Sequence, residues 1–538
     1  MHIFLFFFLY SLCALSNGQQ NVQIQTLLGP ITGAVTRING KSYRRFRGIP
    51  FAEPPVGQLR FRDPVPKKPW APQFLDASGD YGKMCPQEPF VPSLMGEDCL
   101  TLNVFTPKIN NNDNRQYPVM FFIHGGAFIG GGAAQYSSET ILSNLVSRDV
   151  VVVSINYRLG PLGFWFAKGG VEAHGNYGFM DQILALQWVR EHIRNFGGNP
   201  SDVTIFGESA GAASVSLLTL SPLARGLFSK TIMQSGSATA FWAIMSSRRD
   251  VSRQLAENLG CWRNISSQFT TGSQSGFYRS SYNNPAQGSE AEMLACLRGK
   301  SLAEIGAAAN AAAADDELVQ WAANVDGRFL PGPVSALIKQ RPNLPSMMGV
   351  TKDEFGLFDL VFQGPTRTVE KFSSDLNDLA EYGGYNSPTT VTDAILYKYL
   401  DSVTHEQPLS DRNGLFWQNQ SVIAKSAFYM EAPIVRDAVA YAEIGAPVFF
   451  YSFDYISPVL FQESDWRGSV HGSELPYILG VEDTPPGFAY LLRDVWVGVV
   501  NRHDRPKLIK PLKLAEAIFY IFVTLRPLSE TKTSQVQS

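Results

Sequence analysis

Short apolar runs, rich in β-branched and aromatic residues, recur along the chain and alternate with helical patterns. Runs that are apolar on both faces are typical of central strands in a parallel sheet. They cover residues 119–123, 150–157, 203–206, 230–236, 347–351 and 447–455. The clearest helical pattern covers residues 178–198, where Gly197-Gly198 provides the stop signal. The alternation predicts an α/β protein with a large, mostly parallel central sheet covered by helices on both faces.

The first residues form a different pattern, an apolar core from Ile3 to Leu15 followed by small and polar residues. This order predicts a secretory signal peptide over residues 1–18. The core is shorter than the roughly 20 residues that a membrane-spanning helix needs, and the later apolar segment 517–525 is shorter still. We therefore expect a secreted protein, extracellular or in the lumen of the secretory pathway, without a membrane anchor.

The remainder, residues 19–538, is expected to form a single large domain, because the strand and helix patterns continue without a linker. Residues 266–290 are polar and glycine-rich, which predicts a flexible surface loop. The alanine run 307–314, interrupted by Asn310, indicates a helix or the approach to one.

The five cysteines become four if Cys13 leaves with the signal peptide. An even number in an oxidising compartment predicts two disulfides. Sequence order favours Cys85 with Cys99 and Cys261 with Cys296, because each pair closes a local loop. No Cys-x-x-Cys pair or nearby histidine supports a metal site. The net charge of −3 gives no basic stripe for nucleic acid and suits a small or apolar substrate.

A candidate nucleophile lies in Gly207-Glu208-Ser209-Ala210-Gly211. With 46 glycines in 538 residues, the Gly-x-Ser-x-Gly pattern alone is weak evidence. Its position is stronger evidence, since a strand pattern precedes it and a helix pattern of small residues follows it. This order predicts a nucleophile elbow, a sharp turn that exposes the serine hydroxyl at the edge of the sheet.

A serine hydroxyl reacts well only when a neighbouring base takes its proton. Three histidines follow Ser209, namely His405, His471 and His503. We favour His471, because it lies in a glycine-flanked segment after the strand 447–455, whereas the other two have charged or polar surroundings. The strand 347–351 delivers Asp353 and Glu354 as candidates for the carboxylate that orients the histidine. Spacing does not separate these two residues.

Acyl transfer also needs backbone N–H groups that stabilise the developing oxyanion. The sequence HGGAF, residues 124–128, follows the strand 119–123, where an oxyanion loop is expected. The chain therefore carries the parts of a serine hydrolase in a consistent order.

Together these motifs resemble the type-B carboxylesterase and cholinesterase family of α/β-hydrolases. The matching segments are FRGIPFAEPPVGQLRF 46–61, EDCLTLNVF 97–105, HGGAF 124–128, SINYRLGPLGF 154–164, GNYGFMDQ 175–182, FGGNPSDVTIFGESAGAASV 196–215, MQSG 233–236, TKDE 351–354 and HGSE 471–474. The resemblance covers residues 25–480. It implies an α/β-hydrolase fold and two-step ester hydrolysis without a metal or organic cofactor.

The resemblance also implies a role for each site residue. Ser209 would be the nucleophile, His471 the general base and acid, and Glu354 the orienting carboxylate, in place of Asp353. The implied oxyanion donors are the backbone N–H groups of Gly126, Ala127 and Ala210.

The resemblance implies roles for further residues as well. The family's two usual disulfides match the two cysteine pairs above. Its structural ion pairs would be Arg47 with Glu97 and Arg158 with Asp181. Glu208 and Glu474 would border the site, either to tune its electrostatics or as structural residues.

Departures from the family narrow the expected function. The segment between Cys85 and Cys99 lacks the tryptophan with which cholinesterases bind the choline cation. Juvenile-hormone esterases often have glutamine at the position of Glu208. We therefore expect a general carboxylesterase acting on a small carboxylic ester, with a cholinesterase, a hormone esterase or a non-catalytic binding protein as alternatives.

The C-terminal part after about residue 484 diverges from the family and lacks its usual closing segment. No retention tetrapeptide ends the chain, which favours free secretion. Asn264 and Asn419 lie in glycosylation sequons. A monomer or weak dimer is expected, because the tetramer-forming helix of some relatives is missing.

Overall fold

The computed structural model of this chain describes residues 20–108, 115–168, 170, 172–245, 250–262, 289–312, 319–361, 366, 368–382, 387–398, 413–456 and 467–480. Several sequence-based predictions lie outside these ranges. They are the signal peptide, Asn264 with nearly all of the predicted loop 266–290, the segment 517–525, and the divergent region after 484. His405 and His503 lie outside as well.

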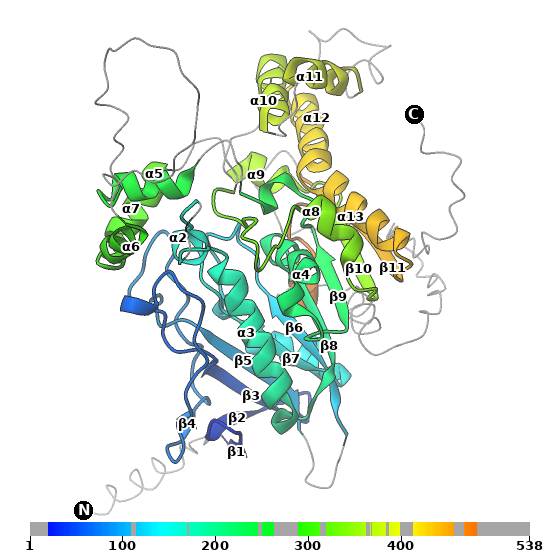
Figure 1. The fold of residues 1–538 in the computed structure, drawn as a ribbon. Coiled ribbons are helices and arrows are strands. Elements are labelled where there is room, and N and C mark those ends of the chain that lie inside the picture. The colour runs from blue at the N-terminus through cyan, green and yellow to red at the C-terminus, as the bar shows by residue number, and fades with distance from the viewer. Residues whose placement is uncertain are drawn as a thin grey trace, which may run out of the picture.

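The described ranges contain an 11-stranded sheet (Figure 1). Its strands are β1 Asn21–Gln25, β2 Pro30–Ile38, β3 Lys41–Pro50, β4 Leu75–Asp76, β5 Thr101–Pro107, β6 Tyr117–Ile123, β7 Val151–Ile155, β8 Gly198–Glu208, β9 Lys230–Gln234, β10 Ser346–Thr351 and β11 Val448–Phe453. Their order is β1-β2-β3-β5-β7-β6-β8-β9-β10-β11, and β4 pairs with β2. From β7 to β11 all neighbours run parallel.

The six predicted apolar runs are these six parallel strands, so the α/β prediction with a mostly parallel sheet is confirmed. The antiparallel strands β1 to β3 and β5 were not predicted from the pattern. In β3 the charged side chains of Arg44, Arg45 and Arg47 interrupt the apolar run, and about one position in three is buried. A strand with one solvent-exposed face has fewer consecutive apolar residues than a strand buried on both faces, so it is harder to recognise in the sequence.

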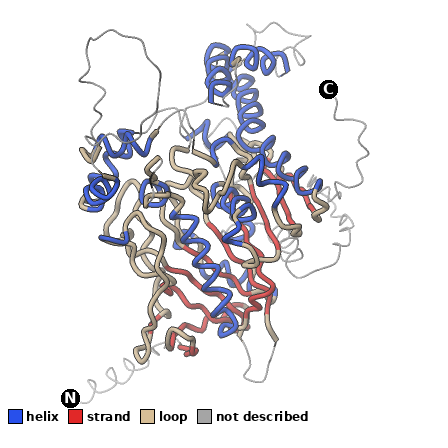
Figure 2. Tube along the Cα trace, in the orientation of Figure 1, coloured by secondary structure: helices blue, strands red, loops and turns tan. Residues whose placement is uncertain are grey.

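The helices α1 Ser138–Asn144, α2 Gly160–Phe164, α3 Tyr177–His192, α4 Ala210–Leu220, α5 Val251–Asn258, α6 Glu290–Arg298, α7 Leu302–Ala312, α8 Val334–Leu337, α9 Gly356–Val361, α10 Val369–Tyr382, α11 Pro388–Leu396, α12 Gly414–Ser426 and α13 Ala432–Glu443 pack around this sheet or extend from it (Figures 1 and 2). A π-helical segment, Ala427–Glu431, joins α12 to α13. The alanine run lies mostly in α7. No helix in the described ranges has the length and apolar character needed to cross a membrane.

Both faces of the sheet are covered, as the alternation along β6 shows. Phe121 and Ile123 join the hydrophobic core that contains residues of α3 and α4. Met120 and Phe122 point to the other face and pack in a cluster with Leu142 of α1. Since neighbouring side chains of a strand point to opposite faces, one apolar run can serve two cores.

Both predicted disulfides are present, Cys85–Cys99 and Cys261–Cys296. They fit an oxidising compartment. The first closes a loop that borders the site described below, and the second ties the segment after α5 to α6.

The prediction of an Arg158–Asp181 ion pair is confirmed. Arg158 donates from Nη2 to Asp181 Oδ1 at 2.6 Å and from Nε to Oδ2 at 2.8 Å, with both side chains buried. A bidentate pair of this kind satisfies both buried charges.

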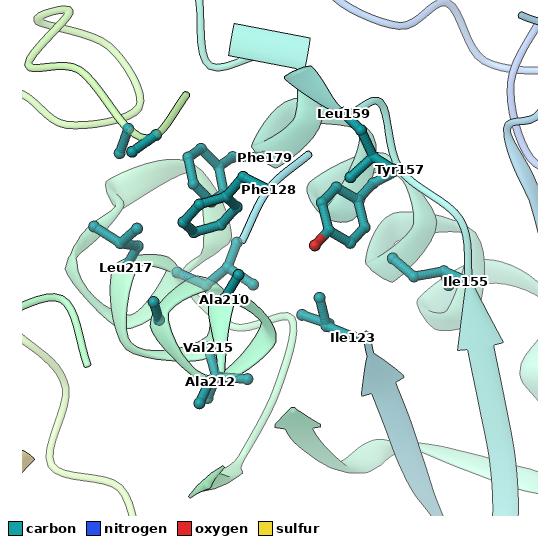
Figure 3. Packing of buried hydrophobic residues seen from close by; sticks show 14 of the residues in the cluster. Ile123, Phe128, Ile155, Tyr157, Leu159, Phe179, Ala210, Ala212, Val215 and Leu217 are labelled. Carbon is teal, nitrogen blue, oxygen red and sulfur yellow. The ribbon is translucent and has the colours of Figure 1, made fainter. Parts of the chain in front are cut away.

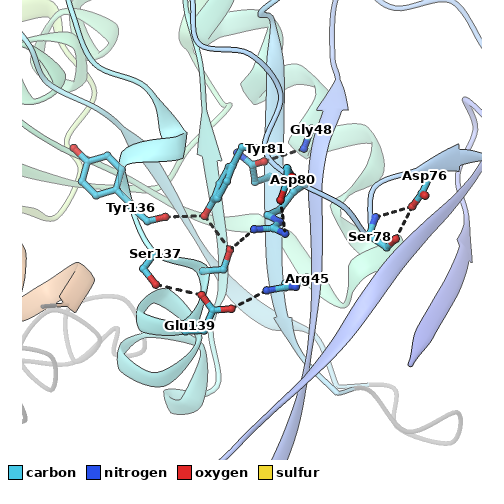
Figure 4. A network of polar contacts seen from close by, with 12 residues as sticks. Arg45, Gly48, Asp76, Ser78, Asp80, Tyr81, Tyr136, Ser137 and Glu139 are labelled. Atoms are coloured by element: carbon cyan, nitrogen blue, oxygen red, sulfur yellow. Dashed lines mark hydrogen bonds and ion pairs between the residues drawn. The ribbon is translucent and has the colours of Figure 1, made fainter. Parts of the chain in front are cut away.

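The prediction that Arg47 pairs with Glu97 is wrong. Glu97 instead accepts two hydrogen bonds from Arg60, at 2.7 and 2.6 Å. Arg47 lies 3.7 Å from Asp80 and donates to Ser138 at the start of α1. Figure 4 shows the surrounding polar network, in which Glu139 accepts from Arg45. Nε and Nη2 of Arg60 bind the two oxygens of Glu97, and the third nitrogen, Nη1, donates to two backbone carbonyls near the start of α7.

Candidate active site

Ser209 lies at the turn between β8 and α4, with φ 58° and ψ −125°. A positive φ is uncommon for a residue with a side chain and marks local strain. The neighbours hold this conformation, since Ser209 N donates to Gln234 O at 2.8 Å and Ala213 N donates to Ser209 O at 2.9 Å. The structure therefore contains the strand, turn and helix expected of a nucleophile elbow.

The glycines of the motif permit this tight turn. A Cβ added to Gly211 would lie 2.1 Å from Ile123 O, and one added to Gly207 would lie 2.6 Å from the same oxygen. No larger residue fits at either position without moving the backbone of β6. This close approach lets the turn carrying Ser209 pack directly on the end of the neighbouring strand.

His471 lies in the loop that follows β11, at a buried position. Its Nδ1 is 2.6 Å from Oε2 of Glu354, which follows β10. His471 N also donates to Glu354 O at 3.2 Å. Glu354 Oε1 accepts from Thr351 N at 2.8 Å, so the carboxylate is held at both oxygens.

Asp353, the other carboxylate of this loop, has a different partner. Its Oδ2 accepts from Ser469 N at 2.9 Å, and its own N donates to Ser469 O at 2.9 Å. Asp353 thus joins the loop after β10 to the loop that carries His471, while Glu354 contacts the imidazole. Hydrogen bonds thus join the two loops at the carboxyl ends of the parallel strands.

The second ring nitrogen of His471, Nε2, lies 3.1 Å from Oε1 of Glu208. Burial favours a neutral ring, but the charges of Glu208 and Glu354 and the hydrogen bond to Glu354 raise the pKa of His471 to about 9. Burial also raises the pKa of Glu208 to about 7 and that of Glu474 to about 8. A cluster of shifted groups of this kind is typical of catalytic sites.

The predicted oxyanion loop packs against the elbow. A Cβ added to Gly125 would lie 2.6 Å from Glu208 O and 3.1 Å from the Cβ of Ser209. Gly126, Ala127 and Phe128 all have positive φ, which turns the backbone sharply at this point. Ala210 is the first residue of α4, where a helix leaves N–H groups without an intrahelical acceptor.

Buried aromatic side chains pack around Phe128 of this loop. Phe128 is fully buried, with ring centroids 5.3 Å from Phe164 and 5.6 Å from Phe179. Figure 3 shows Phe128 and Phe179 side by side near the turn that carries Ala210. The backbone of residues 126–128 is thus fixed by a buried side chain, as preorganised N–H donors require.

Ser209 and His471 line one cavity of about 480 Å³, together with Gly126 and Ala127. This volume lies in the range of small-molecule sites. Most of its other walls are apolar, formed by the loop between Cys85 and Cys99, by α7, and by Leu357, Phe358 and Met430. Such a cavity suits an uncharged organic group better than an ion.

Sequence reasoning missed several residues of this site. Met430 and the residues of α7 lie far from any catalytic motif in the chain, and Trp242 and Phe358 lie outside the motifs that sequence reasoning used. Only the alanine-rich composition of α7 gave a signal, and it indicated a helix rather than a cavity wall. Among the described residues, no group of three His, Cys, Asp or Glu side chains is arranged to hold a metal ion.

Known proteins resemble this chain over most of its length. The model of the carboxylesterase family matches residues 19–488. Esterase cest-33 of Caenorhabditis elegans is 33% identical over 480 residues, covering 86% of this chain and 80% of that protein. Acylcarnitine hydrolase of Mus musculus is 33% identical over 476 residues, 84% and 76% of the two chains. Carboxylesterase 1C of Rattus norvegicus is 32% identical over 487 residues, covering 85% of this chain and 80% of that protein.

Proposed function

Because the chain belongs to the carboxylesterase family and is a carboxylic ester hydrolase, we propose that it is a secreted serine esterase whose catalytic triad is Ser209, His471 and Glu354. The observation that carries this proposal is the 2.6 Å contact between Glu354 and His471 beside the cavity that Ser209 lines. A carboxylate that fixes the imidazole tautomer prepares Nε2 to accept a proton.

The proposed reaction has two steps. Ser209 Oγ attacks the ester carbonyl while His471 takes its proton, and the alcohol leaves with that proton when the C–O bond breaks. Water then adds to the acyl-enzyme with His471 again as the base, and the acid leaves as Ser209 regains its proton. The N–H groups of Gly126, Ala127 and Ala210 would stabilise the negative oxygen of each tetrahedral intermediate.

The substrate we propose is an uncharged carboxylic ester with at least one large apolar group. The apolar walls of the 480 Å³ cavity support this substrate class. No organic cofactor or metal has a role in this mechanism.

Secretion is also a proposal. It is supported by the two disulfides and by the family match, which begins at residue 19, directly after the predicted signal peptide. Asn419 is exposed on α12, at a position open to glycosylation, and Asn264 remains a predicted site. A monomer or weak dimer remains our proposal for the oligomeric state.

Covalent labelling tests the triad. Purified protein is treated with a fluorophosphonate probe, and turnover of p-nitrophenyl acetate is measured. We expect Ser209→Ala to abolish labelling and to lower kcat by about 10⁴-fold or more, while Ser201→Ala, at an exposed serine of β8, keeps both. Labelling that survives in Ser209→Ala would assign the nucleophile to another residue. A choline ester in the substrate panel separates a cholinesterase from a general esterase.

A further inference from the structure

The alanine-rich helix α7 presents one face to the cavity. Leu302, Ile305, Gly306 and Ala309 all line it. They are separated by three, one and three residues, the spacing that brings side chains to one face of a helix. The alanine run noticed in the sequence thus lies against the site that contains Ser209.

Two of these four residues are small. Gly306 has no side chain and Ala309 has a single methyl group, whereas the wall formed after Glu354 and before α13 contributes Leu357, Phe358 and Met430. A larger side chain at position 309 would extend into the cavity volume. Ala309 therefore leaves room that an ester group can occupy.

Gly306 has a second neighbour besides the cavity. A Cβ added there would lie 2.1 Å from Oε1 of Glu88, in the loop closed by the Cys85–Cys99 disulfide. A substitution at Gly306 would move Glu88 as well as fill space. Ala309 is thus the cleaner position at which to change the size of the cavity.

Several contacts hold α7 in place. Arg60, the partner of Glu97, donates to the carbonyls of Arg298 and Lys300 at 3.1 and 2.6 Å, directly before α7 begins. Asn258 of α5 donates to Ala308 O at 3.2 Å. In Figure 1, α5, α6 and α7 lie together at one side of the molecule. The cavity wall is therefore fixed by contacts on the side of the helix away from the substrate.

We propose that Ala309 sets the size of the larger apolar group of the ester, by leaving a space along α7 that this group occupies. The inference rests on the proposed esterase function and names the part of the cavity that determines its preference. It assigns to the alanine-rich helix a role in specificity that differs from the roles of Ser209, His471 and Glu354.

The test compares Ala309→Phe with Ala307→Phe. Ala307 lies on the same helix but is exposed and does not line the cavity. Each variant is assayed with two matched pairs of esters. One pair is p-nitrophenyl acetate and p-nitrophenyl octanoate, which differ in the acyl group, and the other is ethyl acetate and octyl acetate, which differ in the alcohol. The readout is the ratio of kcat/KM for the long ester to that for the short ester.

We expect Ala309→Phe to lower this ratio by about tenfold or more in at least one pair, because filling a well-packed space costs binding of the group that used it. The loss of kcat/KM should be larger for the long ester than for the short ester of the same pair, which a general loss of activity would not produce. Ala307→Phe should leave both ratios unchanged. If Ala309→Phe does not fold, Ala309→Leu makes the same comparison with a smaller side chain.

Two failures can be told apart. Equal ratios in the Ala309 variant, the Ala307 variant and the unchanged protein would overturn the proposed role of α7 while the esterase function stands. An unchanged protein that hydrolyses none of the four esters would count against the proposed function, and the inference would fall with it.

Discussion

Glu208, the residue next to Ser209, places a carboxylate 3.1 Å from Nε2 of His471. This is the nitrogen that must accept the serine proton in the proposed mechanism. A nearby negative charge stabilises the protonated ring, so Glu208 favours the form of His471 that cannot act as a base. The same charge stabilises the imidazolium that forms after Ser209 loses its proton. The net effect of Glu208 depends on pH.

Glu208→Gln is expected to lower the pKa of His471, because one of the charges that raise it is removed. The base is neutral only above its pKa, so kcat/KM rises as pH increases through that value. The acid limb of the kcat/KM profile should therefore move to lower pH by about one unit. Profiles from pH 5 to 10 with p-nitrophenyl acetate measure the shift.

Glu443→Gln provides the control, since Glu443 is exposed at the end of α13. Its profile should match that of the unchanged protein. An acid limb that stays in place in Glu208→Gln would show that Glu208 does not control the titration of His471.

At the scale of elements, a buried charge cluster connects α9, α10 and α12. Lys425 Nζ lies 3.1 Å from Asp359 Oδ1 and 2.9 Å from Asp375 Oδ2, and all three side chains are buried. Thr366 Oγ1 donates to Asp375 at 2.8 Å. Since α9 also carries Leu357 and Phe358 of the cavity, the cluster holds one wall of the site.

Lys425→Met is expected to destabilise the protein by about 3–5 kcal/mol, because two buried carboxylates lose the cation that they share. Lys371 is a matched control. It also pairs with Asp375, but 47% of its side chain is exposed to solvent. Lys371→Met should cost about 1 kcal/mol or less. Urea unfolding gives both free energies, and equal losses in the two variants would contradict the shared burial of the cluster.

Elements whose signal is local could be predicted from the sequence. The parallel strands follow from continuous apolar runs, α4 follows from a pattern of small residues, and the elbow follows from Gly207 near the end of β8 and Gly211 near the start of α4. In contrast, β3 was missed because Arg44, Arg45 and Arg47 interrupt its apolar pattern. When a strand contains both charged and apolar side chains, the local pattern does not show which of its faces is exposed to solvent.

The catalytic residues of the site could be predicted because each lies in a segment that directly follows a predicted strand. Spacing could not separate Asp353 from Glu354, because adjacent residues differ only in where their side chains point. The pairing of Glu97 with Arg60 depends on how two loops approach each other. The face of α7 that lines the cavity depends on packing between distant segments, which an alanine-rich pattern does not specify.

At the scale of the whole molecule, the disulfide Cys85–Cys99 contributes to both stability and the site. The loop it closes carries Gln87 and Phe90 of the cavity wall, and Gln87 also bonds Gly131 beyond the oxyanion loop. We expect Cys85→Ser with Cys99→Ser to cost about 2–5 kcal/mol.

Thermal unfolding measures this loss. Mild reduction of the unchanged protein should lower its Tm in the same direction. Unaltered stability of the double variant would mean that the tertiary contacts of the loop suffice without the bond.

The pH dependence of stability follows from three buried groups near the site. The pKa of Glu208 is raised to about 7, that of Glu474 to about 8 and that of His471 to about 9. Each group binds its proton more tightly in the folded chain than in the unfolded chain, where carboxyls titrate near 4.5 and imidazole near 6.5. The unfolded chain therefore releases these protons first as pH rises, and deprotonation favours unfolding.

The free energy of unfolding should consequently fall between about pH 5 and pH 9, by up to about 1.4 kcal/mol per pH unit for each group that titrates differently in the two states. Glu474→Gln tests one contribution, because the amide has no charge and can still accept the hydrogen bond that Gln234 donates at 3.1 Å. Urea unfolding at each pH should give a shallower decline for this variant between pH 5 and 8. A decline as steep as that of the unchanged protein would mean that Glu474 stays ionised in the folded chain, where Gln234 would then stabilise a charged carboxylate.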